Sequence, residues 1–192
     1  MKNVFRCLVI LICLIVSAGL VFATDTQPPA QDGMLPEITL PVPKNSAHQD
    51  YLWVTGKTSF TIPQVKAEVV IIEIFSMYCP HCQREAPAVN KLYKKIENNR
   101  KLKGRVKLIG IGAGNSDFEV SFFKKKYRIP FPLFSDADFS IHEKLGSVRT
   151  PYFIAVRINK DGTHRVFYSK LGAIKDTDQF LNMISGEVKR DE

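Results

Sequence analysis

Two cysteines separated by two residues, Cys79 and Cys82, are the part of this sequence best suited to covalent chemistry. A pair this close encloses too short a loop to stabilise a fold by much, so redox exchange is the better reason for its presence. At a helix start, the unpaired N–H groups of the first turn and the helix dipole favour a thiolate. The pattern therefore predicts Cys79 as a nucleophile toward disulfides, and Cys82 as the thiol that resolves the mixed disulfide and pairs with Cys79.

The neighbours of the pair suit this chemistry. Pro80 fits the first helical turn because its missing N–H costs nothing there. His81 adds a hydrogen-bond donor, and a positive charge when it is protonated, beside the Cys79 sulfur. We expect these two residues, together with Tyr78, to modulate the reactivity of Cys79.

Metal and cofactor binding are the alternatives for such residues. A structural zinc site needs four ligands. Cys7 and Cys13 lie within the apolar N-terminal run, and the rest of the sequence offers no second cysteine pair and no paired histidines. Haem attachment needs a histidine directly after the second cysteine, where this chain has Gln83. Gly110, Gly112 and Gly114 weakly resemble a dinucleotide loop, but close packing or a turn is the favoured interpretation. We expect no metal and no cofactor.

The first 23 residues have the layout of a secretory signal: Lys2 and Arg6, then an apolar run from 7 to 23, then polarity from Thr24 onward. That run is at the lower edge of the roughly 17 to 25 residues needed to cross a bilayer, so an uncleaved membrane anchor is the alternative. Either outcome predicts a periplasmic or other extracytoplasmic protein, secreted or tethered to the membrane through residues 7–23.

The remaining chain is long enough for one α/β domain and short for two. Residues 24–34 are polar and proline-rich and predict a flexible linker, leaving 35–192 as the domain. The net charge of +8 is mildly basic. Its lysine-rich runs, 94–105 and 124–126, fall where helix surfaces and ends are expected, so solvated faces are favoured and no nucleic-acid partner is predicted.

Strands and helices alternate along the domain. Ala67–Phe75 is an apolar, β-branched run that predicts a buried strand directly before the cysteines, and Pro80–Asn98 has the three-to-four spacing of a helix. Short β-prone pieces at 38–42, 51–54 and 59–62 predict an N-terminal β extension. The same reasoning predicts further strands at 106–111, 131–134, 152–158 and 163–169, and helices at 117–127, 139–145 and 177–188. The result is an α/β fold with a mixed central sheet flanked by helices.

The stretch from Phe75 to Cys82 after a buried strand resembles the active site of the thioredoxin superfamily, and its Pro-His dipeptide resembles that of DsbA-type oxidants. Glu73 resembles the buried acid of the superfamily, Pro87 its helix-kinking proline, and Thr150–Pro151 its cis-proline step. The resemblance covers roughly residues 35 to 188. It implies a thioredoxin-like fold in which Thr150 and Pro151 bind an extended substrate beside Cys79.

Glu73 has two interpretations. If it is buried behind the cysteines, its pKa is raised and it can relay the proton of Cys82. Alternatively, it lies at a strand edge with a lysine partner. We favour the relay and count Glu73 with the catalytic residues.

The spacing between Cys79 and Pro151, together with the stretch 131–136, resembles the exported TlpA and ResA type. This resemblance implies a thiol-disulfide oxidoreductase that acts on protein thiols or disulfides and exchanges electrons with a membrane partner. The architecture implies a reductase, whereas the Pro-His dipeptide implies a disulfide donor, so the direction of electron flow stays open.

Two other functions compete. A peroxiredoxin-type peroxidase needs a cysteine in a Pro-x-x-x-Thr/Ser-x-x-Cys loop, and neither Cys79 nor Cys82 has that setting. A non-catalytic binding module has no need of a reactive dithiol.

Overall fold

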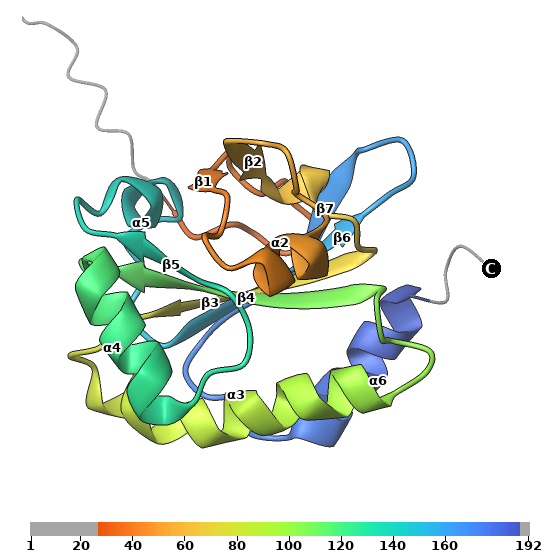
Figure 1. Ribbon diagram of the computed structural model, residues 1–192. Coiled ribbons are helices and arrows are strands. Elements are labelled where there is room, and N and C mark those ends of the chain that lie inside the picture. The colour runs from red at the N-terminus through yellow and green to blue at the C-terminus, as the bar shows by residue number, and fades with distance from the viewer. Residues whose placement is uncertain (1–26, 189–192) are drawn as a thin grey trace, which may run out of the picture.

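The computed structural model describes residues 27–188 (Figure 1). Within these residues, a five-stranded mixed sheet has the order β5-β4-β3-β6-β7. Its strands are β3 (Val69–Phe75), β4 (Val106–Ala113), β5 (Leu133–Asp136), β6 (Tyr152–Ile158) and β7 (His164–Leu171). β3 is central and pairs in parallel with β4 and antiparallel with β6. The mixed α/β sheet predicted from the sequence is confirmed.

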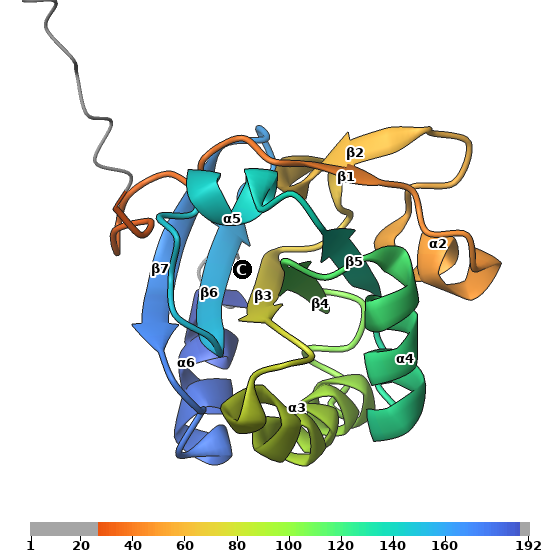
Figure 2. The same ribbon diagram turned by 90° about the vertical axis from the view of Figure 1, so that its left-hand side faces the viewer.

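One face of the sheet is covered by α3 (Pro80–Asn98), α4 (Asp117–Tyr127) and α6 (Thr177–Val188) (Figures 1 and 2). Side chains alternate across a strand, so every second residue of β3 points to this face. Ile71 and Phe75 do so and pack in one apolar cluster with Cys82 and Val89 of α3 and Ile184 of α6. The helix that begins at the cysteines is thus fixed to the sheet along its length.

The opposite face carries the N-terminal extension and α5 (Ser140–Lys144) (Figure 2). The extension comprises β1 (Thr39–Pro41), α2 (Ser46–Leu52), β2 (Ser59–Thr61) and the short 3₁₀ helix η1 (Ile62–Gln64). β1 and β2 pair antiparallel as a separate two-stranded sheet. Leu40 and Phe60, one from each strand, pack with Ile72 and Ile74 of β3. The extension therefore closes the second half of the core.

The β-prone piece predicted at 51–54 is wrong. Leu52 is the last residue of α2, and Trp53 follows it in the left-handed conformation with φ 57°. The helix begins at the cap Asn45, whose side chain accepts the N–H of His48, and such a cap overrides weak strand preferences. The apolar side chains Leu52 and Val54 are fully buried without joining a sheet.

The sequence predicts a signal or anchor over residues 1–23, which lies outside the described residues. It predicts a linker at 24–34, and the described part of that segment contacts the domain without forming a helix or strand. The N–H of Asp32 donates to the Val166 carbonyl at 2.7 Å, and the N–H of Val166 donates to the Gly33 carbonyl at 2.8 Å. No helix among residues 27–188 has the length and apolar character needed to span a bilayer.

The glycines of β4 and the turn after it serve packing. A Cβ at Gly110 would lie 2.5 Å from a methyl of Leu133 and 3.3 Å from the Phe75 ring. Gly114 has φ +64°, and a Cβ there would lie 2.2 Å from the Phe139 ring. The preference for close packing or a turn over a nucleotide loop agrees with this geometry.

We expect Gly114→Ala to lower the free energy of unfolding by about 3 kcal/mol, because it combines left-handed backbone strain with a clash against Phe139. Gly104→Ala is the control, since Gly104 also has positive φ, +78°, but nothing lies within 4 Å of its Cβ position. The control should lose only about 1 kcal/mol in urea denaturation. Equal losses would show that Phe139 does not restrict position 114.

Candidate active site

Cys79 occupies the junction between β3 and α3. It is the N-cap residue of α3, with extended backbone angles, and Pro80 is the first helical residue. The Cys79 N–H donates to the Ser76 carbonyl at 3.1 Å, and the Cys79 carbonyl accepts the Gln83 N–H at 3.1 Å. The sulfur is therefore held where the first turn of the helix leaves N–H groups unpaired.

The loop before Cys79 is held by two side chains that the sequence analysis missed. The N–H of Met77 donates to Asn115 Oδ1 at 2.8 Å, and Gln83 Nε2 donates to the Met77 carbonyl at 2.8 Å. Asn115 is fully buried. Its signal in the sequence is a polar residue two positions after the glycine-containing strand β4, where a buried amide is placed to satisfy the neighbouring loop.

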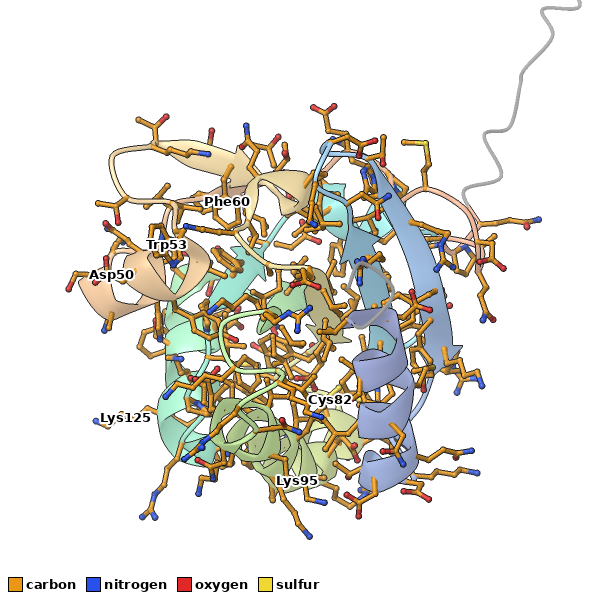
Figure 3. The ribbon with its side chains drawn as sticks, turned by 90° about the vertical axis from the view of Figure 1, so that its right-hand side faces the viewer. Asp50, Trp53, Phe60, Cys82, Lys95 and Lys125 are labelled. Atoms are coloured by element: carbon orange, nitrogen blue, oxygen red, sulfur yellow. The ribbon has the colours of Figure 1, made fainter. Side chains whose placement is uncertain are left out.

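The two thiols have opposite environments. Both cysteines are free, and Cys79 is partly exposed. Cys82, labelled in Figure 3, is fully buried on the face of α3 that packs in the core. Burial alone would raise the pKa of Cys79, but hydrogen bonds from the side chain of Thr150, from Cys82 and from the His81 backbone outweigh it and lower this pKa below 9.0. Burial raises the pKa of Cys82 to about 12. Cys79 is thus the thiol that ionises first.

Thr150 and Pro151, far from the cysteines in sequence, lie beside Cys79. The Cys79 thiol donates to the Thr150 carbonyl at 3.3 Å. The peptide bond between Thr150 and Pro151 is cis, as the family resemblance implies. The structure therefore brings together the reactive sulfur and the backbone that the sequence analysis assigned to substrate binding.

Glu73 is buried, with 2% of its surface exposed, and is not at a solvated strand edge. It lies two residues from both Ile71 and Phe75 on central strand β3, so its side chain points to the α3 face, the same side as Cys82. Burial, and secondarily the charge of Glu85, raise the pKa of Glu73 to about 8. A carboxyl with this pKa can accept or donate a proton near neutral pH.

Glu85 is a second buried carboxyl, which the sequence analysis did not single out. It lies one turn after Cys82 on α3, is 9% exposed, and accepts the N–H of Ile174 at 3.1 Å. Burial raises its pKa, against the effect of that hydrogen bond. The available signal was its spacing, because position i+3 from a buried Cys82 falls on the buried face of the helix.

His81 and Tyr78 are exposed and face different neighbours. Arg84 Nη2 lies 2.9 Å from His81 Nδ1, and a guanidinium can only donate. Nδ1 is therefore the acceptor in this contact. The Tyr78 hydroxyl donates to Glu119 at the start of α4. Tyr78 therefore ties the cysteine loop to a neighbouring helix.

A cavity of about 280 Å³ opens beside the cysteines. Its lining includes Thr150, Pro151, Glu85, Arg84 and Arg149.

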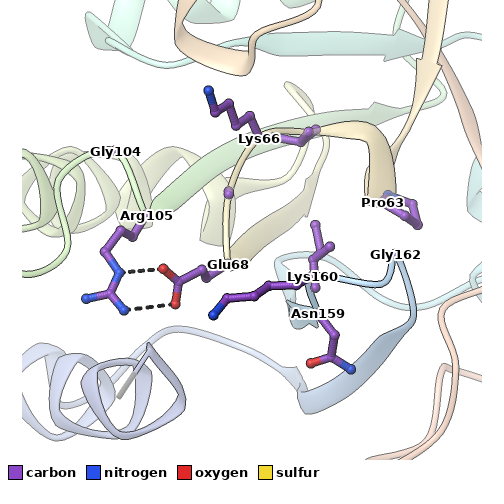
Figure 4. Close-up of a pocket in the computed structure, with 11 residues that line it drawn as sticks. Pro63, Lys66, Glu68, Gly104, Arg105, Asn159, Lys160 and Gly162 are labelled. Carbon is purple, nitrogen blue, oxygen red and sulfur yellow. Dashed lines mark hydrogen bonds and ion pairs between the residues drawn. The ribbon is translucent and has the colours of Figure 1, made fainter. Parts of the chain in front are cut away.

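A cavity of about 650 Å³ lies at the other end of the sheet (Figure 4). Glu68, just before β3, and Arg105, just before β4, form an ion pair at 2.5 Å on its wall. β3 runs from that end toward Cys79, and its seven residues span about 20 Å. The larger cavity is therefore too distant to serve the cysteines.

A mixed sheet carrying a dithiol at the start of the helix after its central strand defines a thioredoxin-like protein. The sequence matches the AhpC/TSA family over residues 34–168, and the chain belongs to that family.

Curated relatives carry the name thiol-disulfide oxidoreductase ResA. The protein from Bacillus thuringiensis is 32% identical over 97 residues, which are 50% of this chain and 52% of that protein. The protein from Halalkalibacterium halodurans is 25% identical over 129 residues, 67% of this chain and 69% of that protein. The chain thus spans about half the length of the first of these relatives.

Solved structures share the fold. The thioredoxin domain of a thiol-disulfide oxidoreductase from Bacteroides vulgatus has a TM-score of 0.59 at 15% identity and covers 83% of this chain and 99% of its own. A secreted disulfide oxidoreductase from Mycobacterium tuberculosis has a TM-score of 0.52 at 20% identity, covering 79% of this chain and 93% of its own. These likenesses establish the thioredoxin-like fold.

We expect iodoacetamide to alkylate Cys79 in the reduced native protein and to leave Cys82 unmodified, because only Cys79 is accessible and readily ionised. The rate at Cys79 should rise with pH through a midpoint below 9.0, the ordinary value. Peptide mapping by mass spectrometry reads each cysteine separately, and unfolding in urea should expose Cys82. Equal labelling of both in the native state would contradict the assignment.

Glu73→Gln should change the pH dependence of stability. The pKa of Glu73 is raised in the fold, so its contribution is fully present below the unfolded value of 4.5 and is lost as pH rises through about 8. At about 1.4 kcal/mol per pKa unit, the variant should gain a few kcal/mol over the wild type between pH 5 and 9. Urea denaturation across this range measures the gain, and exposed Glu143→Gln is the control. A difference that does not vary with pH would refute the raised pKa.

Proposed function

We propose that this protein is a thiol-disulfide oxidoreductase working through Cys79 and Cys82. The observation that carries the proposal is the pairing of a partly exposed Cys79, whose pKa is lowered, with a buried Cys82, whose pKa is raised to about 12. A thiolate accessible from solvent can attack a substrate disulfide. A buried, protonated thiol three residues later can then resolve the mixed disulfide. The ResA name of the relatives supports the same chemistry.

The exchange proceeds in two displacements. The Cys79 thiolate attacks one sulfur of a substrate disulfide, forming a Cys79–substrate disulfide and releasing the other substrate sulfur as a thiolate. Cys82 then loses its proton and attacks Cys79, which forms the Cys79–Cys82 disulfide and releases the second substrate thiolate. Two electrons pass from the dithiol to the substrate. The backbone of Thr150, beside the Cys79 sulfur, is placed to hold the substrate chain during the first attack.

The second displacement needs a base, because Cys82 with a pKa of about 12 carries almost no thiolate at neutral pH. Glu73 is our proposed acceptor. Its pKa of about 8 places it near the working pH, and it lies on the same face of β3 that α3 and Cys82 cover. An ordinary exposed carboxyl would be too weak a base for this step.

We propose that electrons flow from the protein to its substrates, as in a reductase. A disulfide donor of the DsbA kind is strongly oxidising because its reduced form is stabilised. A histidine ring that donates a hydrogen bond to the thiolate would supply such stabilisation, but among residues 27–188 the His81 ring contacts Arg84 rather than the Cys79 sulfur. The Pro-His dipeptide in this chain therefore does not by itself indicate an oxidant.

We further propose an extracytoplasmic location, with a membrane protein as electron donor. The signal-like pattern of residues 1–23 is the main support. A structural neighbour from Mycobacterium tuberculosis is described as secreted. Residues 7–23 would serve as a tether if the signal is not cleaved.

The reduction potential of the pair tests the direction. Equilibration of the purified protein in graded dithiothreitol buffers should give a value near thioredoxin's about −270 mV or lower, well separated from DsbA's about −120 mV. A value near −120 mV would reverse the proposed direction while retaining the chemistry.

Trapping tests the chemistry itself. Cys82→Ser should accumulate a mixed disulfide at Cys79 with a disulfide-bonded protein such as insulin, because the resolving thiol is gone, and Cys79→Ser should form none. Hydrogen peroxide is the competing substrate to assay. Peroxide consumption without any mixed disulfide would favour the peroxidase alternative.

A further inference from the structure

A groove leads from the cysteines along the end of β7. Its first part is the 280 Å³ cavity beside Thr150 and Pro151. Its second part, about 520 Å³, lies between β7 and α6. Leu171 and Ala173 line both parts, so the two are continuous. A polypeptide bound beside Thr150 could therefore extend over Leu171 toward α6.

The floor of this groove offers an apolar contact. Leu171, the last residue of β7, lines the cavity beside Thr150 and Pro151, and 52% of its surface is exposed. Phe180 and Met183 of α6 line the far end. An extended peptide binds through its backbone hydrogen bonds and through pockets that accept its alternate side chains. The apolar residues of the groove can supply such pockets.

The rim of the groove is basic. Arg84 and Arg149 line the first part, and Lys170 and Lys175 line the second. Within residues 27–188, none of these four side chains has a carboxylate partner at ion-pair distance. Arg84 contacts His81 Nδ1, and the Lys170 ammonium lies 5.5 Å from the centre of the Tyr168 ring, but neither contact neutralises a positive charge. The four side chains can therefore attract an anionic ligand.

The groove has two acidic residues, Glu85 and Asp176, which offset only part of the charge of its four basic residues. Asp176 lies at the start of α6. Its carboxylate accepts hydrogen bonds from the N–H groups of Asp178 and Gln179, at 2.9 Å each. Glu85 accepts the N–H of Ile174, and burial raises its pKa. Neither carboxyl faces an arginine or lysine of the rim in an ion pair. The groove thus carries an excess of positive charge next to Cys79.

We propose that this groove selects substrates in which acidic residues flank the reacting cysteine, with Arg149 as the principal specificity-determining residue. Arg149 directly precedes Thr150, so a carboxylate one or two residues from the substrate cysteine falls within its reach. Its planar guanidinium suits a carboxylate in a two-bond contact. The proposal rests on the disulfide exchange proposed above and names the substrate class for that site.

The test compares two peptides in exchange with the reduced protein. They are identical except that aspartates flank the single cysteine in one and lysines flank it in the other, and each cysteine is in a disulfide with 2-nitro-5-thiobenzoate. Exchange oxidises Cys79 and Cys82 and releases the peptide thiol and the coloured thiol. Each second-order rate is divided by the same protein's rate with hydroxyethyl disulfide, which is small and uncharged.

The wild type should favour the aspartate peptide about five- to tenfold at low ionic strength, and 1 M NaCl should remove most of this preference. Arg149→Glu should abolish or reverse the preference. Lys175→Glu, farther along the groove, should reduce it by a smaller factor. Arg100→Glu is the matched control and should retain the wild-type preference. Arg100 lies beyond the far end of α3, a helix of 19 residues that is about 28 Å long.

The outcomes separate the two proposals. Exchange with both peptides at equal normalised rates would overturn the acidic-substrate groove and leave the oxidoreductase intact. A preference that survives Arg149→Glu and Lys175→Glu would also overturn it. No exchange with any disulfide, hydroxyethyl disulfide included, would instead refute the proposed function.

Discussion

The contact between the Cys79 sulfur and the Thr150 carbonyl, at 3.3 Å, joins the two halves of this fold. Cys79 is the last residue of the loop from β3 to α3. Thr150 lies two residues before β6, the antiparallel neighbour of β3. Their approach depends on the pairing of these two strands, which fixes both junctions at the same end of the sheet. The sheet therefore acts as the frame that sets the position of the reactive sulfur.

The two thiols of the site differ in their exposure to water. One helical turn carries a thiol at the protein surface and another in the apolar cluster under α3. The same burial that protects Cys82 raises the pKa of Glu73 and Glu85. A raised carboxyl pKa costs stability at alkaline pH, because ionisation in a dry interior is unfavourable. The cost falls where the proposed resolution step by Cys82 needs a base near neutrality.

Local sequence signals predicted most of the architecture. The helices at 80–98 and 117–127 and the strand at 152–158 have the predicted bounds, because their periodicity and caps agree with their burial. The strand predicted at 51–54 was wrong, since a helix cap outweighed the strand-prone composition of this segment. Cys79, Cys82 and Thr150 were candidates from spacing and resemblance, and the structure brings the three together. Asn115 and Glu85 were missed because their local signals, a polar residue after β4 and an i+3 spacing from Cys82, do not indicate the tertiary neighbours that they bind.

The site separates reactivity from recognition. In the interior, groups that would carry charge are held close to neutrality: Cys82 has its pKa raised to about 12 and Glu73 to about 8. Fixed positive charge lies at the rim instead, on Arg84 and Arg149. Exposed charges are screened by salt and tolerate substitution, whereas buried ones are expensive to change. Under the proposed charge selection, substitutions at the rim therefore change substrate preference without disturbing the dithiol.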